Sequence, residues 1–158
     1  ASSRFCSLAT LATFVAFTSS ASTFDDAKRF GAHHAVVSKD SAAIKKLGRS
    51  LDLLISTVNV PLDWDALIGT LAPHGRLHVV GAVLEPIPVA AFSLIMGQRS
   101  VSGSPTGSPV AIETMLAFAS RHQITPHTEH FPMSQINEAF ARLKAGKARY
   151  RIVLDADF

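Results

Sequence analysis

Residues 51–81, LDLLISTVNVPLDWDALIGTLAPHGRLHVVG, decide the fold of this chain. The run Leu51–Ser56 is apolar on both faces after its second residue, which predicts a strand buried on both sides. A helix is expected over Leu62–Leu71, a turn over Pro73–Gly75 and another central strand over Leu77–Val80. A strand, a helix and a strand in this order predict two parallel strands joined by a crossover helix.

The same alternation continues on both sides of this segment. Further strands are expected over Phe14–Phe17, His34–Val37, Ser100–Gly103 and Arg149–Leu154. Further helices are expected over Thr23–Phe30, Ser41–Leu47, Ala90–Met96, Ile112–His122 and Gln135–Ala145, the last with Ser134 as its N-cap. The sequence therefore predicts an α/β fold, with an incomplete Rossmann-type and mostly parallel sheet, flanking helices and a C-terminal helix–strand segment.

Composition narrows the class of protein. The 158 residues are 47% hydrophobic and 17% charged, which suits a buried sheet rather than a disordered or coiled-coil chain. The net charge of +3 is small and the basic residues are scattered, which argues against nucleic-acid binding. No apolar stretch approaches the roughly 20 residues of a membrane span. Cys6 is the only cysteine, so an internal disulfide and a zinc site of several thiolates are excluded, and a reducing, cytoplasmic location is expected.

The beginning of the chain lacks a feature that such a fold normally has. A dinucleotide-binding sheet starts with a strand and a glycine-rich turn, because only bare backbone approaches a pyrophosphate closely. Here no glycine precedes Gly31, and the segment Ser7–Thr13 carries side chains instead. Residues 1–22, with Arg4 and an apolar run, are similar to a secretory signal. An altered or truncated N-terminus is the favoured interpretation, and the signal peptide stays open as the alternative.

Several stretches together resemble a known family. They are Thr18–Ser20, Gly31–Ala32, LDLLISTVNV (51–60), GRLHVVGA (75–82), FSLIMGQRSVSGS (92–104) and INEAFARLKAGKARYRIVLD (136–155). In order and spacing they resemble the C-terminal, cofactor-binding part of zinc-dependent medium-chain alcohol dehydrogenases, in the cinnamyl-alcohol-dehydrogenase-like branch. The resemblance covers residues 15–158. It implies an atypical segment over residues 1–13, a partial dinucleotide-binding domain over 14–126, and a C-terminal segment of the otherwise missing catalytic domain over 127–158.

The end of the first strand bears on the choice of cofactor. An NAD site requires a carboxylate there to bind the ribose diol, whereas Thr18, Ser19 and Ser20 offer three hydroxyls that can donate to a 2′-phosphate. NADP is therefore the expected cofactor. In the family a lysine usually helps to hold that phosphate, and its place is taken here by Thr23, which removes one charge-assisted contact. The alternative is a Ser/Thr-rich loop without a ligand.

The resemblance implies further cofactor and substrate contacts. It places Thr57 and Gly81 beside the cofactor at the carboxyl edge of the sheet, where open α/β sheets bind ligands. The alternatives are that Thr57 caps a helix and that Gly81 only permits a turn. Three consecutive residues would approach the nicotinamide end of the cofactor: Ser104, Pro105 and Thr106. Three others would line the substrate pocket, with plain core packing as the alternative: Phe92, Ile95 and Met96.

Partners and missing chemistry follow from the same resemblance. The edge strand Ser100–Gly103 would join two subunits in a homodimer, since an unpaired edge invites strand pairing. The family's zinc ligands lie on the catalytic domain, and Cys6 alone supplies no zinc site. The histidines His33, His34, His127 and His130 are interpreted as surface or turn residues. No set of nucleophile, base and orienting residue is expected, because Ser50, Ser56 and Ser93 lack the setting of a nucleophile elbow.

These observations lead to one function and two alternatives. The chain is predicted to be the cofactor-binding half of an NADP-dependent alcohol dehydrogenase, an oxidoreductase acting on alcohols and aldehydes, and to be inactive alone. A non-catalytic fragment or subunit-pairing module is the first alternative, and a zinc-free, NADPH-dependent quinone-reductase-like enzyme is the second. The stripe Ile136, Phe140 and Leu143 is expected to be exposed, which predicts a marginally stable or self-associating monomer.

Overall fold

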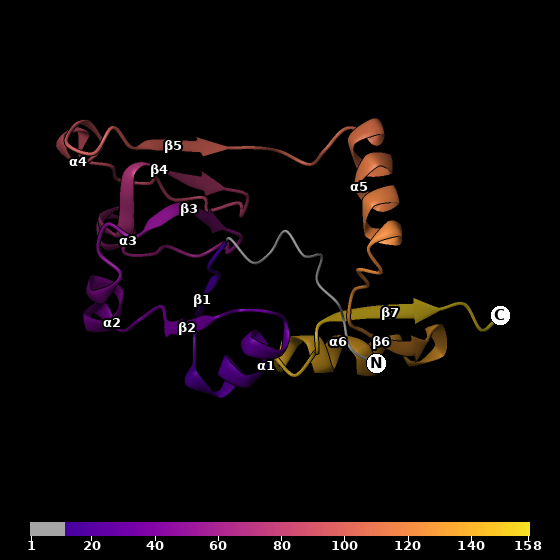
Figure 1. The fold of residues 1–158 in the computed structure, drawn as a ribbon. Coiled ribbons are helices and arrows are strands. Elements are labelled where there is room, and N and C mark those ends of the chain that lie inside the picture. Colours follow the sequence, from indigo (N-terminus) through magenta and orange to yellow (C-terminus); the bar gives the residue numbers. More distant parts are fainter. Residues whose placement is uncertain (1–11) are drawn as a thin grey trace. The chain divides into compact units, whose positions relative to one another are not determined.

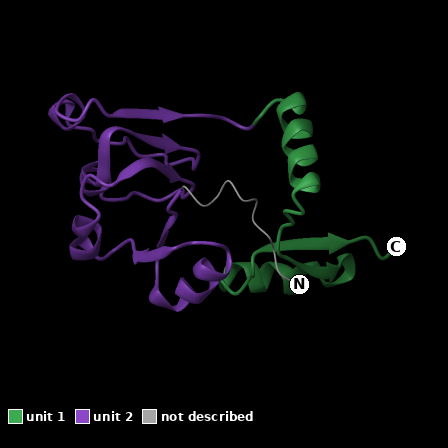
Figure 2. Cartoon of the chain, viewed as in Figure 1, with its two compact units in different colours: residues 1–7, 107–158 green, residues 8–106 purple. Residues whose placement is uncertain are grey.

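A computed structural model describes residues 12–158 of the chain (Figure 1). These residues form two compact units, 12–106 and 107–158, which are described separately below (Figure 2). The units divide between Thr106 and Gly107 by their internal contacts. The boundary expected near residue 127 concerns the domains of a larger enzyme and stays a prediction. The segment 1–11, which includes Cys6, lies outside the described residues.

The first unit alternates strands and helices as the sequence predicts. Its elements are β1 (Val15–Thr18), η2 (Ala21–Thr23), α1 (Phe24–Arg29), β2 (His34–Val37), α2 (Ser41–Lys46), β3 (Leu51–Ser56), α3 (Trp64–Thr70), β4 (Leu71–Val79), α4 (Ala91–Ile95) and β5 (Ser100–Gly103). All strand pairs are parallel, in the orders β1–β2 and β3–β4–β5. The predicted α/β class, with parallel sheets and flanking helices, is confirmed.

One buried cluster holds the first unit together. Helix α3 begins where the Asp63 carboxylate accepts a hydrogen bond from the Ala66 amide at 3.1 Å. The helix lays its apolar side on β3 and β4, where Leu71, Leu77 and Ile68 are fully buried. The buried members of this cluster are Leu54, Trp64, Leu67, Ile68, Leu71 and Leu77. Burial of each such side chain contributes about 1.5–3 kcal/mol to folding stability. The strands β3 and β4 are therefore held in place by this cluster.

The opposite face of β3 is open, contrary to the sequence expectation. Leu53 and Ile55 are each 55% exposed, while their neighbour Leu54 is buried. Alternate residues of a strand point to opposite faces, and no element of residues 12–106 covers the face that carries Leu53 and Ile55. The prediction of a strand buried on both sides is therefore wrong for the described chain, since burial depends on tertiary cover that the strand's own composition does not supply.

The turn predicted at Pro73–Gly75 lies within β4. The pairing of β3 with β4 shifts register there, from Leu51 opposite Leu71 to Leu53 opposite Arg76. His74 adopts a φ of 64°, and its amide donates to the Gly97 carbonyl at 2.8 Å. The turn is therefore an irregularity inside one strand.

The second unit is smaller. Its elements are α5 (Pro109–Arg121), β6 (Thr128–Pro132), η3 (Met133–Gln135), α6 (Ile136–Lys144) and β7 (Arg151–Asp155), with β6 parallel to β7. Strand β6 was not predicted. Helix α5 begins before Ile112 because the Ser108 hydroxyl caps it, with Pro109 in its first turn.

Ser134 does not cap α6, so that prediction is wrong. Ser134 lies in the preceding 3-10 turn, and its hydroxyl donates instead to the Asp157 carboxylate. Gln135 occupies the cap position without a side-chain hydrogen bond. The Ser134 hydroxyl therefore forms a hydrogen bond with the distant Asp157 in place of a capping hydrogen bond with the nearby backbone.

Polar contacts rather than a core hold the second unit. Ala139 is its buried hydrophobic residue. Phe140 and Leu143 are 51% and 53% exposed, as the sequence predicted, whereas Ile136, the third member of the expected stripe, is half-buried. The Arg142 guanidinium donates two hydrogen bonds to the Glu129 carboxylate, and the Arg149 amide donates a third at 2.7 Å. The hydrogen bond from Arg142 is the main cause that lowers the pKa of Glu129 below its ordinary value. Among the described residues, no helix is long and apolar enough to cross a membrane.

Candidate cofactor-binding edge

The carboxyl ends of β3, β4 and β5 meet at one edge of their sheet. Ser56 is in register with Val79, and Val79 with Gly103. The residues that follow continue this arrangement, since the Gly81 amide donates to the Ser56 carbonyl at 3.1 Å and the Ser104 amide to the Val79 carbonyl at 3.3 Å. Thr57, Gly81 and Ser104 thus come together at the edge where α/β sheets bind ligands.

The end of β1 presents hydroxyls that are not equally available. The Thr18 and Thr23 hydroxyls both donate to the Ser20 carbonyl, at 2.9 and 2.8 Å. The Ser20 hydroxyl oxygen accepts a hydrogen bond from the Ser22 amide at 3.2 Å. The Ser19 side chain is exposed and has no hydrogen bond to another described residue. Ser19 is therefore the hydroxyl best placed to donate to a ligand, and the other hydroxyls also shape the loop.

Gly81 has a packing role of its own. A Cβ at this position would lie 1.9 Å from the Val58 carbonyl oxygen and 2.7 Å from the Thr57 carbonyl carbon. The backbone after β4 therefore passes so close to the backbone after β3 that only glycine fits. This gives the turn interpretation of Gly81 a physical basis, and a cofactor contact there stays a prediction. For Thr57 the helix-cap alternative is excluded, because Asp63 caps α3.

A buried hydroxyl beside this edge lacks a partner. Ser56, the last residue of β3, is 7% exposed, and its Oγ makes no hydrogen bond in the structure. Buried polar atoms are nearly always paired with protein, water or ligand atoms. The Ser56 hydroxyl is therefore an unsatisfied polar atom beside the edge, which Ser56→Ala can test for a ligand contact.

Sequence reasoning missed a histidine next to the edge. His78 on β4 makes hydrogen bonds to two serines, through Nδ1 to the Ser102 Oγ at 2.9 Å and through Nε2 to the Ser104 Oγ at 3.0 Å. The signal that could have found it is a lone histidine inside the apolar run of GRLHVVG, opposite serines at alternate positions of the next strand.

The residues expected at the substrate and nicotinamide ends are exposed. Phe92, Ile95 and Met96, in or next to α4, are 71%, 70% and 65% exposed, so the alternative of core packing is wrong for them. Pro105 and Thr106 are also exposed. Packing within the first unit therefore leaves most of the surface of these side chains exposed.

No metal centre is found in the part of the chain that the structure describes, where no three His, Cys, Asp or Glu residues gather as ligands. His33 instead accepts a hydrogen bond from the Phe14 amide at 3.1 Å through Nδ1. The described residues therefore do not fit the family's zinc.

A Thr–His–Asp line that the sequence did not predict lies between β6 and β7. His130 contacts the Asp155 carboxylate at 3.0 Å through Nδ1 and the Thr128 hydroxyl at 3.1 Å through Nε2. The His130 and Asp155 side chains are 55% and 57% exposed, so water competes for these contacts. The arrangement is therefore an exposed hydrogen-bond network that connects β6 and β7.

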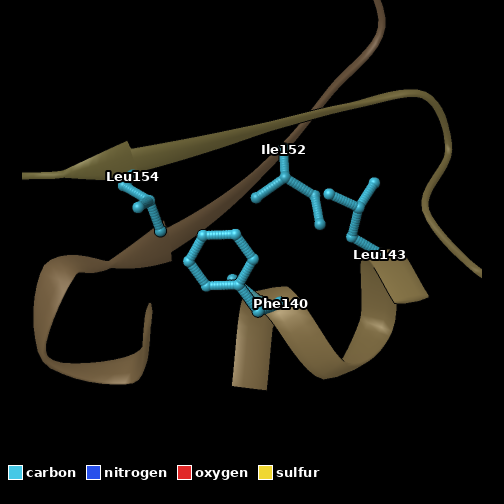
Figure 3. A pocket seen from close by; sticks show the side chains of 5 residues that line it. Phe140, Leu143, Ile152 and Leu154 are labelled. Carbon is cyan, nitrogen blue, oxygen red and sulfur yellow. The ribbon is translucent and has the colours of Figure 1, made fainter. Parts of the chain in front are cut away.

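The second unit also has a shallow apolar depression of about 180 Å³ between α6 and β7 (Figure 3). It is lined by Ala139, Phe140, Leu143, Ile152 and Leu154. The lining side chains carry no polar atom, so they offer no hydrogen bond to a phosphate or a ribose.

Comparison with known proteins assigns the family. The profile of the family described as zinc-binding dehydrogenase matches residues 5–121. The chain belongs to this family. The match begins at residue 5, so the expectation that residues 1–13 lie outside the resemblance is corrected in part. The medium-chain alcohol dehydrogenase resemblance is confirmed.

Individual relatives agree with this assignment. The chain is 54% identical over 139 residues to the aldehyde reductase AdhA of Synechocystis, covering 88% of this chain and 41% of that protein. The structure of a cinnamyl alcohol dehydrogenase from Sorghum bicolor matches with a TM-score of 0.83 and 35% identity, over 90% of this chain and 41% of that one. That of a Helicobacter pylori CAD complexed with NADP(H) matches with a TM-score of 0.77 and 28% identity, over 94% and 42%. The chain spans about two fifths of the length of each of these relatives.

Proposed function

We propose that residues 12–106 contribute the cofactor-binding edge of an NADP-dependent alcohol dehydrogenase, which interconverts alcohols and aldehydes by hydride transfer at nicotinamide C4. The observation that carries the proposal is the meeting of Thr57, Gly81 and Ser104 at one carboxyl edge, held by the amides of Gly81 and Ser104. In the proposed function this edge binds and orients the nicotinamide half of the cofactor, and the loop after β1 binds its adenosine phosphate.

The polar groups after β1 support NADP over NAD. A carboxylate at that place would accept hydrogen bonds from a ribose diol but repel a 2′-phosphate. Here the exposed Ser19 hydroxyl can donate, and Ser20 and Thr18 hold the loop around it. The likeness to an enzyme whose structure is complexed with NADP(H) supports the same choice.

The described residues supply contacts to a cofactor rather than catalysis. They hold no group of metal ligands, and the histidine–carboxylate pair of the second unit lies on an exposed strand surface. We therefore propose that the chain alone turns over no alcohol. Phe92, Ile95 and Met96 are proposed as walls of the substrate pocket of the whole enzyme, since their apolar side chains are exposed.

The first experiment is a titration of the 158-residue chain with NADPH and with NADH, followed by nicotinamide fluorescence. NADPH is expected to bind more tightly than NADH. Ser19→Asp should reverse this order and weaken NADPH roughly tenfold, because a charge-assisted contact is replaced by repulsion. Ser50→Asp adds the same charge within the first unit, at the amino end of β3 and so at the opposite end of the sheet, and should leave both affinities unchanged. Equal binding of the two cofactors by the wild-type chain, or no binding, contradicts the proposed specificity.

A second candidate function is subunit pairing through β5. This strand pairs with β4 on one side only, so its other backbone edge is open in the described chain. We propose a homodimer in which two β5 strands pair. Val101→Lys would bring two ammonium groups together at such a contact and should shift the sedimentation coefficient to that of a monomer. Val110→Lys on α5 serves as the control, and a dimer that persists with Val101→Lys excludes this contact.

The remaining expectations complete the proposal. We propose that residues 14–126 belong to the dinucleotide-binding domain and 127–158 to the catalytic domain of a cytoplasmic enzyme. The apolar depression on α6 and β7 supports this division, because an exposed apolar surface favours association.

A further inference from the structure

One face of β4 and β5 carries a row of polar side chains. In a parallel pair, residues in register point to the same face, and successive members of that face are two residues apart. Arg76 is in register with Ser100, and His78 with Ser102, while Ser104 follows two residues later at the edge. The other face carries the fully buried Leu77. The row therefore runs along the open face toward the proposed nicotinamide position.

Hydrogen bonds connect this row up to the edge. The half-buried His78 ring lies between two hydroxyls, with Nδ1 2.9 Å from the Ser102 Oγ and Nε2 3.0 Å from the Ser104 Oγ. Ser104 itself is exposed. A flexible exposed serine normally samples several rotamers, so the imidazole reduces the freedom of the Ser104 hydroxyl.

The direction of these hydrogen bonds follows from an acceptor behind Ser102. The Ser102 hydroxyl lies 3.5 Å from the Leu77 carbonyl oxygen, which can only accept. If Ser102 donates there, its oxygen accepts from His78 Nδ1–H. Nε2 of the neutral ring is then an acceptor, and the Ser104 hydroxyl must donate to it. This leaves the lone pairs of the Ser104 oxygen turned to solvent, where they accept a hydrogen bond from an N–H group.

We propose that His78 is a positioning residue that presents the Ser104 oxygen as an acceptor to the carboxamide N–H of the nicotinamide ring. The proposal rests on the cofactor site proposed above and deepens it. A carboxamide is the group on this half of the cofactor that offers N–H donors, so Ser104 would recognise the nicotinamide rather than the adenosine. His78 acts through Ser104 and need not touch the cofactor.

The competing interpretation is that the row is only a set of surface polar groups satisfying one another. The Arg76–Ser100 pair is such a case, since Arg76 Nε donates to the Ser100 Oγ at 3.3 Å at the end of the row remote from the edge. Ser100→Ala is therefore the matched control for changes at His78.

The test uses two ligands and three variants of the full chain. The affinity of NADPH is compared with that of adenosine 2′,5′-bisphosphate, which lacks the nicotinamide. His78→Asn keeps an amide near the Nδ1 position and loses the reach to Ser104, whereas His78→Gln extends an amide toward the Nε2 position. His78→Asn should weaken NADPH roughly three- to tenfold and leave the bisphosphate unchanged. His78→Gln should restore most of the loss, and Ser100→Ala should change neither ligand.

A double-variant cycle and the ring tautomer complete the test. In a Ser104→Ala background, His78→Asn should have no further effect on NADPH, because the two residues act as one unit. Nitrogen NMR of the wild-type imidazole should show the Nδ1–H tautomer.

Three results would overturn the proposal: unchanged NADPH affinity in His78→Asn, equal weakening of both ligands, or an Nε2–H tautomer. If the wild-type chain binds the bisphosphate but not NADPH, the inference falls while an adenosine site remains. If it binds neither ligand, the cofactor site itself is refuted and the inference falls with it.

Discussion

Residues 12–106 bury seven hydrophobic side chains, six of them in one cluster around α3, whereas residues 107–158 bury only Ala139. The first unit thus holds its sheet by packing. In the second unit, strand hydrogen bonds hold β6 to β7 and the Glu129–Arg142 pair holds β6 to α6. The difference indicates that the proposed cofactor-binding edge is supported by packing within its own unit. The second unit exposes apolar surface, which favours association.

The most damaging single change should be in the cluster of the first unit. Leu77→Ala removes a side chain that is 0% exposed, and it should reduce the free energy of unfolding by about 2–5 kcal/mol. Leu84→Ala, at a side chain that is 94% exposed, should change it by less than about 0.5 kcal/mol. Urea denaturation of the three proteins measures both. Equal effects of the two variants would show that this cluster is not the core.

Gly81→Ala should come next, because the added Cβ would collide with the Val58 carbonyl 1.9 Å away. We expect a loss of about 1–3 kcal/mol as the loops after β3 and β4 move apart. Gly69→Ala in α3 is the matched control, since nothing lies within 4 Å of its Cβ and alanine favours a helix by about 0.5–1 kcal/mol. Thermal unfolding should give opposite signs for the two variants. A neutral Gly81→Ala would refute the close approach of the loops.

The second unit should lose stability in acid. Hydrogen bonds from Arg142 and Arg149 lower the pKa of folded Glu129 below its unfolded value. Their contribution is therefore complete above the ordinary glutamate pKa and is lost as the pH falls through the lowered one. Amide NMR signals of β6 and β7 should show this acid transition in the wild-type chain, and Glu129→Gln should weaken the unit at neutral pH.

Glu113→Gln on α5 provides the control for that experiment. It removes a carboxylate from the same unit without touching Arg142 or Arg149, and it should keep the wild-type acid transition. An acid transition that survives Glu129→Gln would place its origin elsewhere.

The smallest effect is expected at Ser56. Its buried hydroxyl has no partner, so Ser56→Ala removes an unsatisfied polar atom and should leave stability unchanged or raise it by up to about 1 kcal/mol. Thermal unfolding with and without NADPH separates the two explanations of this atom. A loss of NADPH stabilisation in Ser56→Ala would indicate a ligand contact, and a loss of stability without ligand would contradict the unpaired state.

The local pattern was sufficient for two of the three strands that carry the edge. Leu51–Ser56 and Ser100–Gly103 were predicted with the bounds that the structure shows, as was His34–Val37 in the other sheet, because each run ends at a clear turn signal. Strand β4 was predicted only over Leu77–Val80, because the Pro73–Gly75 signal that indicates a turn lies inside it. Strand β6 was not predicted, because Thr128–Pro132 is mostly polar and ends in proline. This segment forms a strand through its pairing with β7.

Features that depend on distant contacts could not be predicted. The exposure of Leu53 and Ile55 depends on which elements cover the sheet, and the Ser134 hydroxyl binds Asp157, which is 23 residues away. The His78–Ser104 contact requires the register of β4 with β5, which no local pattern sets. At the candidate site, the sequence therefore indicated which residues lie at the edge. It did not indicate which of their side chains form hydrogen bonds with one another.

Hydrogen exchange with and without NADPH tests the central claim most directly. If the carboxyl edge of the first unit binds the cofactor, NADPH should slow exchange at the amides near Ser19, Thr57, Gly81 and Ser104 and leave β6 and β7 unchanged. Unchanged exchange at the edge in saturating NADPH, or protection confined to residues 107–158, would contradict it.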